Sequence, residues 1–284
     1  MRVIRAEVMG MCFGVRDALK VIAEIGSPAA VTIHGELVHN EAVLSRLEAR
    51  GFAMASEVDR RRLPETPVVL ITAHGVSDRE RGRLEAAGKR LVDTTCPLVT
   101  RVHQAALALR DEGFYIIVIG KRGHVEVRGI VEDLTRFDVV ESEDEVGAYS
   151  HPRIGIVCQT TVPSRTVARV REAVAARNPD AEIKFVDTVC LPTKEHQRAL
   201  DRLLGQVEAM VVVGGRNSNN TRELAALCRE RGVPALHVQD VTDLDPEWFH
   251  GFETVGLTAG TSTLDTTIDA VHQALSRLPE AARA

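Results

Sequence analysis

Three cysteines stand at equivalent places in a repeated pattern, and this repetition limits the folds that the chain can adopt. The segment around Cys96, "LVDTTCPLVTRVHQAAL", resembles the segment around Cys190, "FVDTVCLPTKEHQRAL". In both segments a hydrophobic run leads into the cysteine and a helical pattern follows it. A third cysteine, Cys12, lies in the glycine-framed stretch "MGMCFGVRDAL", which also precedes a helical pattern. The sequence therefore predicts one structural unit that occurs three times.

The spacing after each cysteine repeats as well. A hydrophobic run ends in a polar loop 27 or 28 residues after the cysteine, and a second hydrophobic run in each repeat ends in another polar loop. The polar residues are His39, His124 and Ser218 in the first set of loops, and His74, Thr160 and Ser262 in the second set. Each of these loops precedes a helical pattern.

Short runs rich in valine and isoleucine alternate with amphipathic helical stretches along the chain. Residues 115–120 and 210–215 are such runs, and residues 97–111 and 218–230 are such helical stretches. This alternation is typical of parallel α/β units. We therefore expect an α/β fold of three pseudo-threefold-related units with mainly parallel sheets. The expected units are 13–96, 97–190 and 191–284, with an N-terminal strand within 1–12 completing the third.

The composition is that of a globular protein and argues against several classes of partner. The chain has 284 residues, 44% of them hydrophobic, with a net charge of -5. This charge does not favour nucleic acid as a partner. No apolar run reaches the roughly 18 residues that would span a membrane. Five scattered cysteines in a chain of this length do not form a disulfide framework, so we expect a cytoplasmic protein with reduced thiols.

The cysteines of the repeat are candidate metal ligands. Ligands of parallel α/β sheets bind at the carboxyl ends of the strands, so Cys12, Cys96 and Cys190 are expected to converge there. Structural zinc favours a fourth protein ligand and local pairs of cysteines, which this sequence lacks. A central 4Fe-4S cluster with three cysteine ligands and one open iron fits better. Cys158 and Cys228 lie outside the repeat positions and are predicted to serve packing.

Neutral or cationic donors surround this predicted centre. Most of them stand just before a helix, where unpaired N–H groups and the helix dipole favour phosphate. Several converging charge-assisted hydrogen bonds would hold a diphosphate. The predicted donors are His39, His74, His124, Ser218, Asn220 and Ser262. Glu126 is the predicted proton donor of this cavity, and Thr160 is predicted to relay or orient the proton.

Taken together, the motifs resemble one known family. "GMCFGV", "GELVHN", "TAHGV", "DTTCPLVTRVH", "GHVEV", "QTT", "DTVC", "RNSNNT" and "GLTAGTS" occur in order over nearly the whole chain and resemble the 4-hydroxy-3-methylbut-2-enyl diphosphate reductases, or LytB family. The resemblance implies reductive removal of an allylic hydroxyl, giving isopentenyl and dimethylallyl diphosphates, in the last step of the non-mevalonate isoprenoid pathway. It implies a ferredoxin- or flavodoxin-like electron donor.

The resemblance also implies residue roles. Cys12, Cys96 and Cys190 would hold the 4Fe-4S cluster, whose open iron would bind the substrate oxygen, and Glu126 would deliver protons while Thr160 positions the hydroxyl. The diphosphate would be bound by His39, His74, His124, Ser218, Asn220 and Ser262, with Asn219 beside them. Three residues depart from the family's usual pattern: Asn219, Val125 and His196.

Two alternatives stay open at the level of the sequence. One is a lyase similar to quinolinate synthase, which also arranges three repeated units around an open-iron cluster. Its acidic substrates would not need Glu126 or the polar stretch 218–220. The other is a non-enzymatic iron-sulfur sensor, which an additional binding segment would support.

Overall fold

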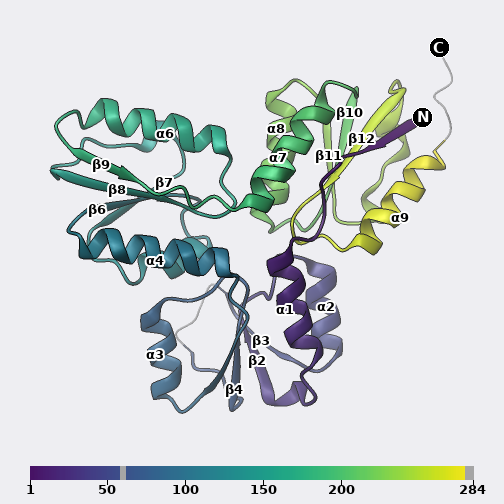
Figure 1. The fold of residues 1–284 in the computed structure, drawn as a ribbon. Coiled ribbons are helices and arrows are strands. Elements are labelled where there is room, and N and C mark those ends of the chain that lie inside the picture. The colour runs from purple at the N-terminus through teal and green to yellow at the C-terminus, as the bar shows by residue number, and fades with distance from the viewer. Residues whose placement is uncertain (58–61, 279–284) are drawn as a thin grey trace. The chain divides into compact units, whose positions relative to one another are not determined.

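The computed structural model describes residues 1–57 and 62–278. The chain forms two compact units (Figure 1). Unit 1 comprises Met1–Phe13, His39–Glu41 and Leu191–Ala284, and unit 2 comprises Gly14–Val38 and Ala42–Cys190. Two parts of the predicted α/β units, 58–61 and 279–284, lie outside the described residues.

Unit 1 contains a four-stranded parallel sheet, sheet A, in the order β1-β12-β10-β11. Its strands are β1 (Arg2–Arg5), β10 (Ala209–Val213), β11 (Ala235–Val238) and β12 (Thr254–Ala259), and its helices are α7 (Leu191–Leu204), α8 (Asn219–Glu230) and α9 (Asp265–Ser276). The N-terminal strand pairs with β12, with Arg2 opposite Thr254. A strand from the start of the chain therefore completes this sheet.

Unit 2 contains two further parallel sheets. Sheet B has the order β3-β2-β4-β5, and sheet C has the order β7-β6-β8-β9. The elements of sheet B are β2 (Val31–His34), β3 (Ala53–Ala55), β4 (Val68–Ile71) and β5 (Arg90–Asp93), with α1 (Phe13–Ala23), α2 (Glu41–Ala49) and α3 (Asp78–Ala86). The elements of sheet C are β6 (Tyr115–Ile119), β7 (Phe137–Val140), β8 (Arg153–Cys158) and β9 (Glu182–Phe185), with α4 (Pro97–Asp111), α5 (Val125–Val131) and α6 (Ser164–Arg177). Short 3-10 turns link some of the elements; they are η1 (Pro28–Ala30), η2 (Glu143–Glu145), η3 (Val241–Asp243) and η4 (Pro246–Phe249).

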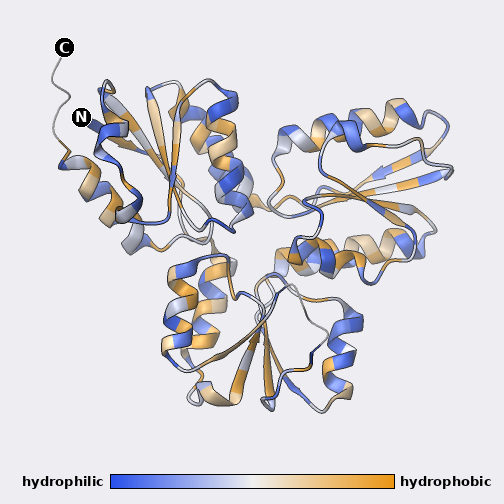
Figure 2. Ribbon diagram, turned by 180° about the vertical axis from the view of Figure 1, so that it is seen from behind, coloured by the Kyte–Doolittle hydropathy of each residue, from blue (hydrophilic) through white to orange (hydrophobic). Residues whose placement is uncertain are grey.

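The central strands are buried on both faces, which explains their hydrophobic sequences. In β10, Met210 and Val212 pack into one hydrophobic cluster with α7 and α8, while Val211 packs into another with α9. Alternate residues of a strand point to opposite faces, so helices on both sides bury the whole run. The strands are correspondingly apolar and the helices carry both apolar and polar residues in Figure 2.

The three sheets share one strand order, and this confirms the predicted fold of three parallel α/β units. In the three sheets, the edge strands β1, β5 and β9 pair with β12, β4 and β8, respectively. These strands pair in turn with β10, β2 and β6. The edge strands β1, β5 and β9 each lead into one of the three repeat cysteines. The helix predicted over 97–111 is observed as Pro97–Asp111, with proline in its first turn.

The division into units 13–96, 97–190 and 191–284 stays a prediction, since the compact units number two and unit 1 also includes His39–Glu41. Sheets B and C share unit 2. No helix in the described part of the chain combines the length and apolar character needed to cross a membrane.

Candidate active site

In unit 2, the predicted site residues follow the carboxyl ends of their strands. His74 follows β4 and Cys96 follows β5 in sheet B. In sheet C, His124, Thr160 and Cys190 follow β6, β8 and β9. The strands of each sheet run parallel, so these loops leave each sheet at a single edge. Chemistry-bearing side chains therefore gather at the carboxyl edge of each sheet.

Glu126 and Thr160 form a buried carboxyl–hydroxyl pair. The Thr160 backbone N–H donates to Glu126 Oε1 at 2.7 Å, and the Thr160 hydroxyl donates to Oε2 at 2.8 Å. Glu126 is 2% exposed and Thr160 is 6% exposed. Both carboxyl oxygens thus have a defined donor from a residue 34 positions away. The Thr160 carbonyl in turn accepts from the backbone N–H of Cys190 at 3.0 Å.

His124 is the N-cap of α5, and this role determines its tautomer. Its Nδ1 accepts a hydrogen bond from the backbone N–H of Glu126 at 3.1 Å. An accepting Nδ1 carries no proton, so a ring proton of His124 is on Nε2. The ring of His74 lies edge-to-face with that of His124, with centroids 5.7 Å apart and an interplanar angle of 85°. The two predicted diphosphate donors of unit 2 are therefore neighbours.

Cys96 is supported by the loop that carries His74. Its backbone N–H donates to the carbonyl of Ala73 at 3.1 Å. Gly14 also comes so close that a Cβ there would lie 2.6 Å from the Cys96 sulfur. Only glycine leaves the Cys96 side chain its observed place, which is a structural reason for one glycine of the "MCFG" stretch.

In unit 1, the start of α8 presents a polar turn. Ser218 is its N-cap and accepts from the Thr221 backbone N–H at 3.3 Å, while Asn219 and Asn220 form the first turn and are buried. Asn220 Oδ1 accepts from the backbone N–H of Thr261 at 3.0 Å. Among the described residues, its buried Nδ2 has no hydrogen-bond partner. An unsatisfied buried donor is costly, and it suits an anionic ligand.

The segment containing His39 is tied to the loop after β12. Ser262 Oγ donates to the His39 carbonyl at 3.1 Å, and Asn40 Nδ2 donates to the Ser262 carbonyl at 2.8 Å. A Cβ at Gly215 would lie 2.5 Å from the His39 carbonyl oxygen, so glycine permits this approach. The predicted ligands His39 and Ser262 are therefore neighbours, although 223 positions separate them.

Cys12 belongs to the same part of unit 1. Its backbone N–H donates to the Thr261 carbonyl at 3.0 Å. The peptide N–H of Thr261 is bound to Asn220, so one residue supports both a predicted cluster ligand and a predicted diphosphate ligand. The convergence of Cys12 with Cys96 and Cys190 stays a prediction, because Cys12 belongs to unit 1 and the other two to unit 2.

The five thiols differ in accessibility. Cys12, Cys96 and Cys190 are half-buried, whereas Cys158 and Cys228 are fully buried. Burial raises the pKa of Cys228 to about 12, and its thiol donates to the Leu224 carbonyl at 3.2 Å. Metal ligands are thiolates, so Cys228 is unsuited to that role.

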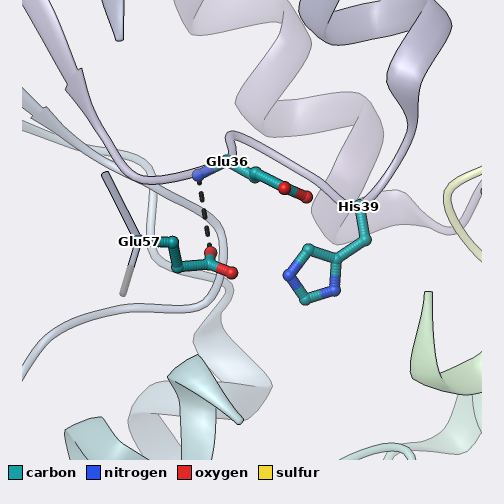
Figure 3. A group of neighbouring side chains, drawn as sticks. All are labelled: Glu36, His39 and Glu57. Atoms are coloured by element: carbon teal, nitrogen blue, oxygen red, sulfur yellow. Dashed lines mark hydrogen bonds between the residues drawn. The ribbon is translucent and has the colours of Figure 1, made fainter. Parts of the chain in front are cut away.

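Two carboxylates and one amide near the predicted residues did not stand out in the sequence. The Glu36 backbone N–H donates to a carboxyl oxygen of Glu57 at 3.4 Å (Figure 3). Arg128 of α5 donates to the Glu57 carbonyl. Asn40 directly follows His39, so that adjacency was a usable signal for it. Glu36 and Glu57 are brought together only by the pairing of β2 with β3.

His196, one of the three departures from the family's pattern, is buried in α7. Burial lowers its pKa to about 4, against the opposing effect of its hydrogen bond to the Ala259 backbone. Its Nδ1 has no partner among the described residues. The Ala259 carbonyl also accepts from the Gly10 N–H at 3.3 Å, so His196 contacts the same residue as the turn before Cys12.

The fold and the site together define the chain as a three-sheet α/β protein with an enzyme-like site. Half-buried thiols, histidines and a buried acid follow its strand ends. The family model described as LytB protein matches residues 3–276. This protein therefore belongs to the LytB family, and membership implies an iron-sulfur cluster.

Individual relatives agree with this assignment. The chain is 33% identical over 286 residues to the 4-hydroxy-3-methylbut-2-enyl diphosphate reductase of Aquifex aeolicus (strain VF5), covering 98% of this chain and 97% of the relative. It is similar to the structure of the E-1-hydroxy-2-methyl-but-2-enyl-4-diphosphate reductase from Plasmodium falciparum, with a TM-score of 0.89 and 27% identity, covering 98% and 89% of the two chains. A second solved structure, of (E)-4-hydroxy-3-methyl-but-2-enyl diphosphate reductase, the terminal enzyme of the non-mevalonate pathway, gives a TM-score of 0.66 at 32% identity, covering 97% and 99%.

Proposed function

We propose that this protein is a 4-hydroxy-3-methylbut-2-enyl diphosphate reductase, the terminal enzyme of the non-mevalonate pathway. In this reaction two electrons and two protons convert the allylic alcohol to isopentenyl or dimethylallyl diphosphate and water. The C–O bond breaks, and the carbon skeleton gains one hydrogen. The observation that carries the proposal is the buried Glu126–Thr160 pair in a chain of the LytB family.

Proton delivery is the step that Glu126 and Thr160 would perform. Hydroxide is a poor leaving group, so the departing oxygen must be protonated or bound to a Lewis acid. The Thr160 hydroxyl lies 2.8 Å from Glu126 Oε2, within the distance for direct proton transfer. Its backbone N–H holds the other carboxyl oxygen, which orients the acid. We infer that Glu126 is the proton source and that Thr160 orients the substrate hydroxyl.

Diphosphate binding is the role that we assign to the polar residues of the strand-end loops. His124 contributes its ring at the N-terminus of α5, and the buried Nδ2 of Asn220 lacks a hydrogen-bond partner among the described residues. Each charge-assisted hydrogen bond contributes about 1.5–3 kcal/mol, so a few of them suffice to hold the anion. The full proposed set is His39, His74, His124, Ser218, Asn219, Asn220 and Ser262.

The iron-sulfur cluster implied by the family fits the thiols of this chain. The three repeat cysteines are the half-buried ones, and Gly14 leaves room for the Cys96 sulfur. We propose that Cys12, Cys96 and Cys190 hold one 4Fe-4S cluster with one open iron. When bound, such a cluster supplies electrons and a Lewis-acidic iron for the substrate oxygen.

Reduction also needs an electron source, and we propose a ferredoxin- or flavodoxin-like protein in the cytoplasm. Such carriers deliver single electrons, which matches the one-electron chemistry of iron-sulfur clusters.

The proposal can be tested with anaerobically purified protein. The enzyme would be incubated with reduced methyl viologen and 4-hydroxy-3-methylbut-2-enyl diphosphate, and the products separated by chromatography. We expect isopentenyl and dimethylallyl diphosphates to form in proportion to the cluster content. Protein with a full cluster that leaves the substrate unconsumed would refute the reductase assignment.

A further inference from the structure

Two acidic residues just after α5 bind the start of α3, and together these residues form what we call the α5–α3 clamp. Asp133 Oδ2 accepts from the Asp78 backbone N–H at 2.7 Å, and its Oδ1 accepts from the Arg79 N–H at 3.1 Å. The preceding residue, Glu132, accepts from the Ser77 hydroxyl at 2.8 Å. All five residues belong to unit 2.

The clamp supplies hydrogen-bond acceptors for the first backbone N–H groups of α3. The first N–H groups of a helix have no partner within it, and the dipole there favours negative charge. In α3 the Ser77 hydroxyl caps the Glu80 N–H at 3.0 Å, while Asp133 takes the N–H groups of Asp78 and Arg79. The cap of a helix beside sheet B is thus supplied largely by a residue from the sheet C region.

The body of α3 is anchored separately to sheet B. Glu80 accepts from Arg83 through Nε and Nη2, both at 2.7 Å, and lies 2.8 Å from Nε2 of His34 in β2. Burial alone would raise the pKa of Glu80, but its bonds and charge interactions with Arg83 and His34 outweigh burial and lower it. The helix is therefore held from both sides, by its own sheet and by the clamp.

The loop before α3 connects the clamped end of the helix to Cys96 through hydrogen bonds and packing. The Gly75 N–H donates to the Thr72 carbonyl at 3.0 Å, and the Ala73 carbonyl accepts from the Cys96 N–H at 3.1 Å. A Cβ on Gly75, whose φ is +71°, would lie 3.0 Å from Thr95, so the loop packs tightly against the residue before Cys96. His74 lies within this loop, three residues before the clamped Ser77.

The opposite end of α5 carries the proposed acid. Glu126 lies in its first turn and holds Thr160, whose carbonyl accepts from Cys190. The helix spans only Val125–Val131, so a single rigid element connects Glu126 with the clamp. A continuous path of contacts within unit 2 thus links Cys190, Thr160, Glu126, α5, the clamp, the His74 loop and Cys96.

We propose that Glu132 and Asp133 are positioning residues, which set the loop of His74 and Cys96 relative to Glu126 and Cys190. The inference rests on the function proposed above, since it concerns the geometry of those site residues. A displacement of about 1 Å at a reacting group can reduce the rate about 100-fold, so such a link between two sheets matters for catalysis.

Hydrogen–deuterium exchange of the anaerobic holoenzyme tests the clamp directly. The variant E132A/D133A removes every clamp acceptor, D133N retains one acceptor oxygen at residue 133, and E132Q retains an acceptor for Ser77. D180A is the matched control, because Asp180 is exposed in the turn between α6 and β9. We expect E132A/D133A to exchange faster at Asp78 and Arg79 and also at Ala73, Gly75 and Cys96. D133N is expected to be intermediate, and both E132Q and D180A to resemble the wild type.

Kinetics provide the second readout, at a temperature where circular dichroism shows all variants folded. We expect E132A/D133A to lower kcat/KM at least tenfold, with E132Q close to the wild type. Faster exchange confined to residues 78–83, or a wild-type kcat/KM in E132A/D133A, would overturn the positioning role. If the double variant does not fold, D133N decides by the same two criteria. An inactive wild type with a full cluster would instead overturn the reductase assignment, and the exchange pattern would still decide on the clamp.

Discussion

Replacing Gly14 by alanine should separate an effect on apoprotein stability from an effect on iron binding. Gly14 lies in the first turn of α1 and is buried. Alanine is the better helix former, and in a helix it stabilises by about 0.5–1 kcal/mol relative to glycine. The added Cβ, however, would lie 2.6 Å from the Cys96 sulfur and 3.2 Å from the Cys96 Cβ.

The steric overlap between the added Cβ and the Cys96 sulfur should displace the thiol. Non-bonded carbon atoms pack best at about 3.5–4.0 Å, and sulfur is larger, so the Cys96 sulfur would have to move by about 1 Å. Metal–ligand distances in real sites lie within about 0.2 Å of their ideal values. We therefore expect G14A to lose Cys96 as a ligand while the apoprotein keeps its fold.

Iron content and apoprotein stability should then change independently. The iron-to-protein ratio and the visible absorbance of the cluster would be measured after anaerobic reconstitution, and urea unfolding would be followed on the apoprotein. Gly82 is the matched control, because it lies within α3 and a Cβ added there would meet no neighbouring atom of the described residues within 4 Å. G82A should gain about 0.5–1 kcal/mol and bind iron normally. Wild-type iron content and activity in G14A would refute the steric argument.

Three further predictions follow from named residues. E126Q should retain the cluster and lose about 100-fold or more in kcat, the usual contribution of a general acid; unchanged turnover in the viologen assay would remove Glu126 from proton delivery. C190S should lose iron on reconstitution, whereas C228S should bind it normally, and equal iron in both would contradict the ligand assignment. The pKa of His196 is about 4 in the folded protein and about 6.5 in the unfolded chain. Between these pH values the unfolded chain binds a proton that the folded protein does not, so lower pH favours unfolding. The apoprotein should lose about 3 kcal/mol of unfolding free energy over that interval, and H196Q should lose less in pH-dependent urea titrations; an equal loss in both would show that His196 is not the cause.

The position of a candidate site residue was predictable where that residue follows its own strand. His74, His124 and Ser218 each stand a few residues beyond a hydrophobic run, and the carboxyl end of a parallel strand is a local property of the sequence. Glu126 could be selected because it lies two residues after His124. The resemblance added Asn219, which the repeat alone did not select, and the structure places it in the first turn of α8.

Contacts between distant segments were not predictable in the same way. The clamp joins Asp133 to Asp78, 55 positions apart, and no repeat or motif marks either residue. The tautomer of His124 likewise follows from the hydrogen bond that its ring accepts as a helix cap.

The amino-acid sequence alone determined the α/β class, the three repeats, the cysteine positions and the family resemblance. Helix and strand periodicity and strand-end loops are local, so they can be read along the chain. The tertiary structure decided that Glu126 holds Thr160, that β1 completes sheet A beside β12, and that Gly14 lies against Cys96. Such pairings depend on how separate elements pack, because close-packed interiors admit few arrangements and distance along the chain does not specify which side chains meet.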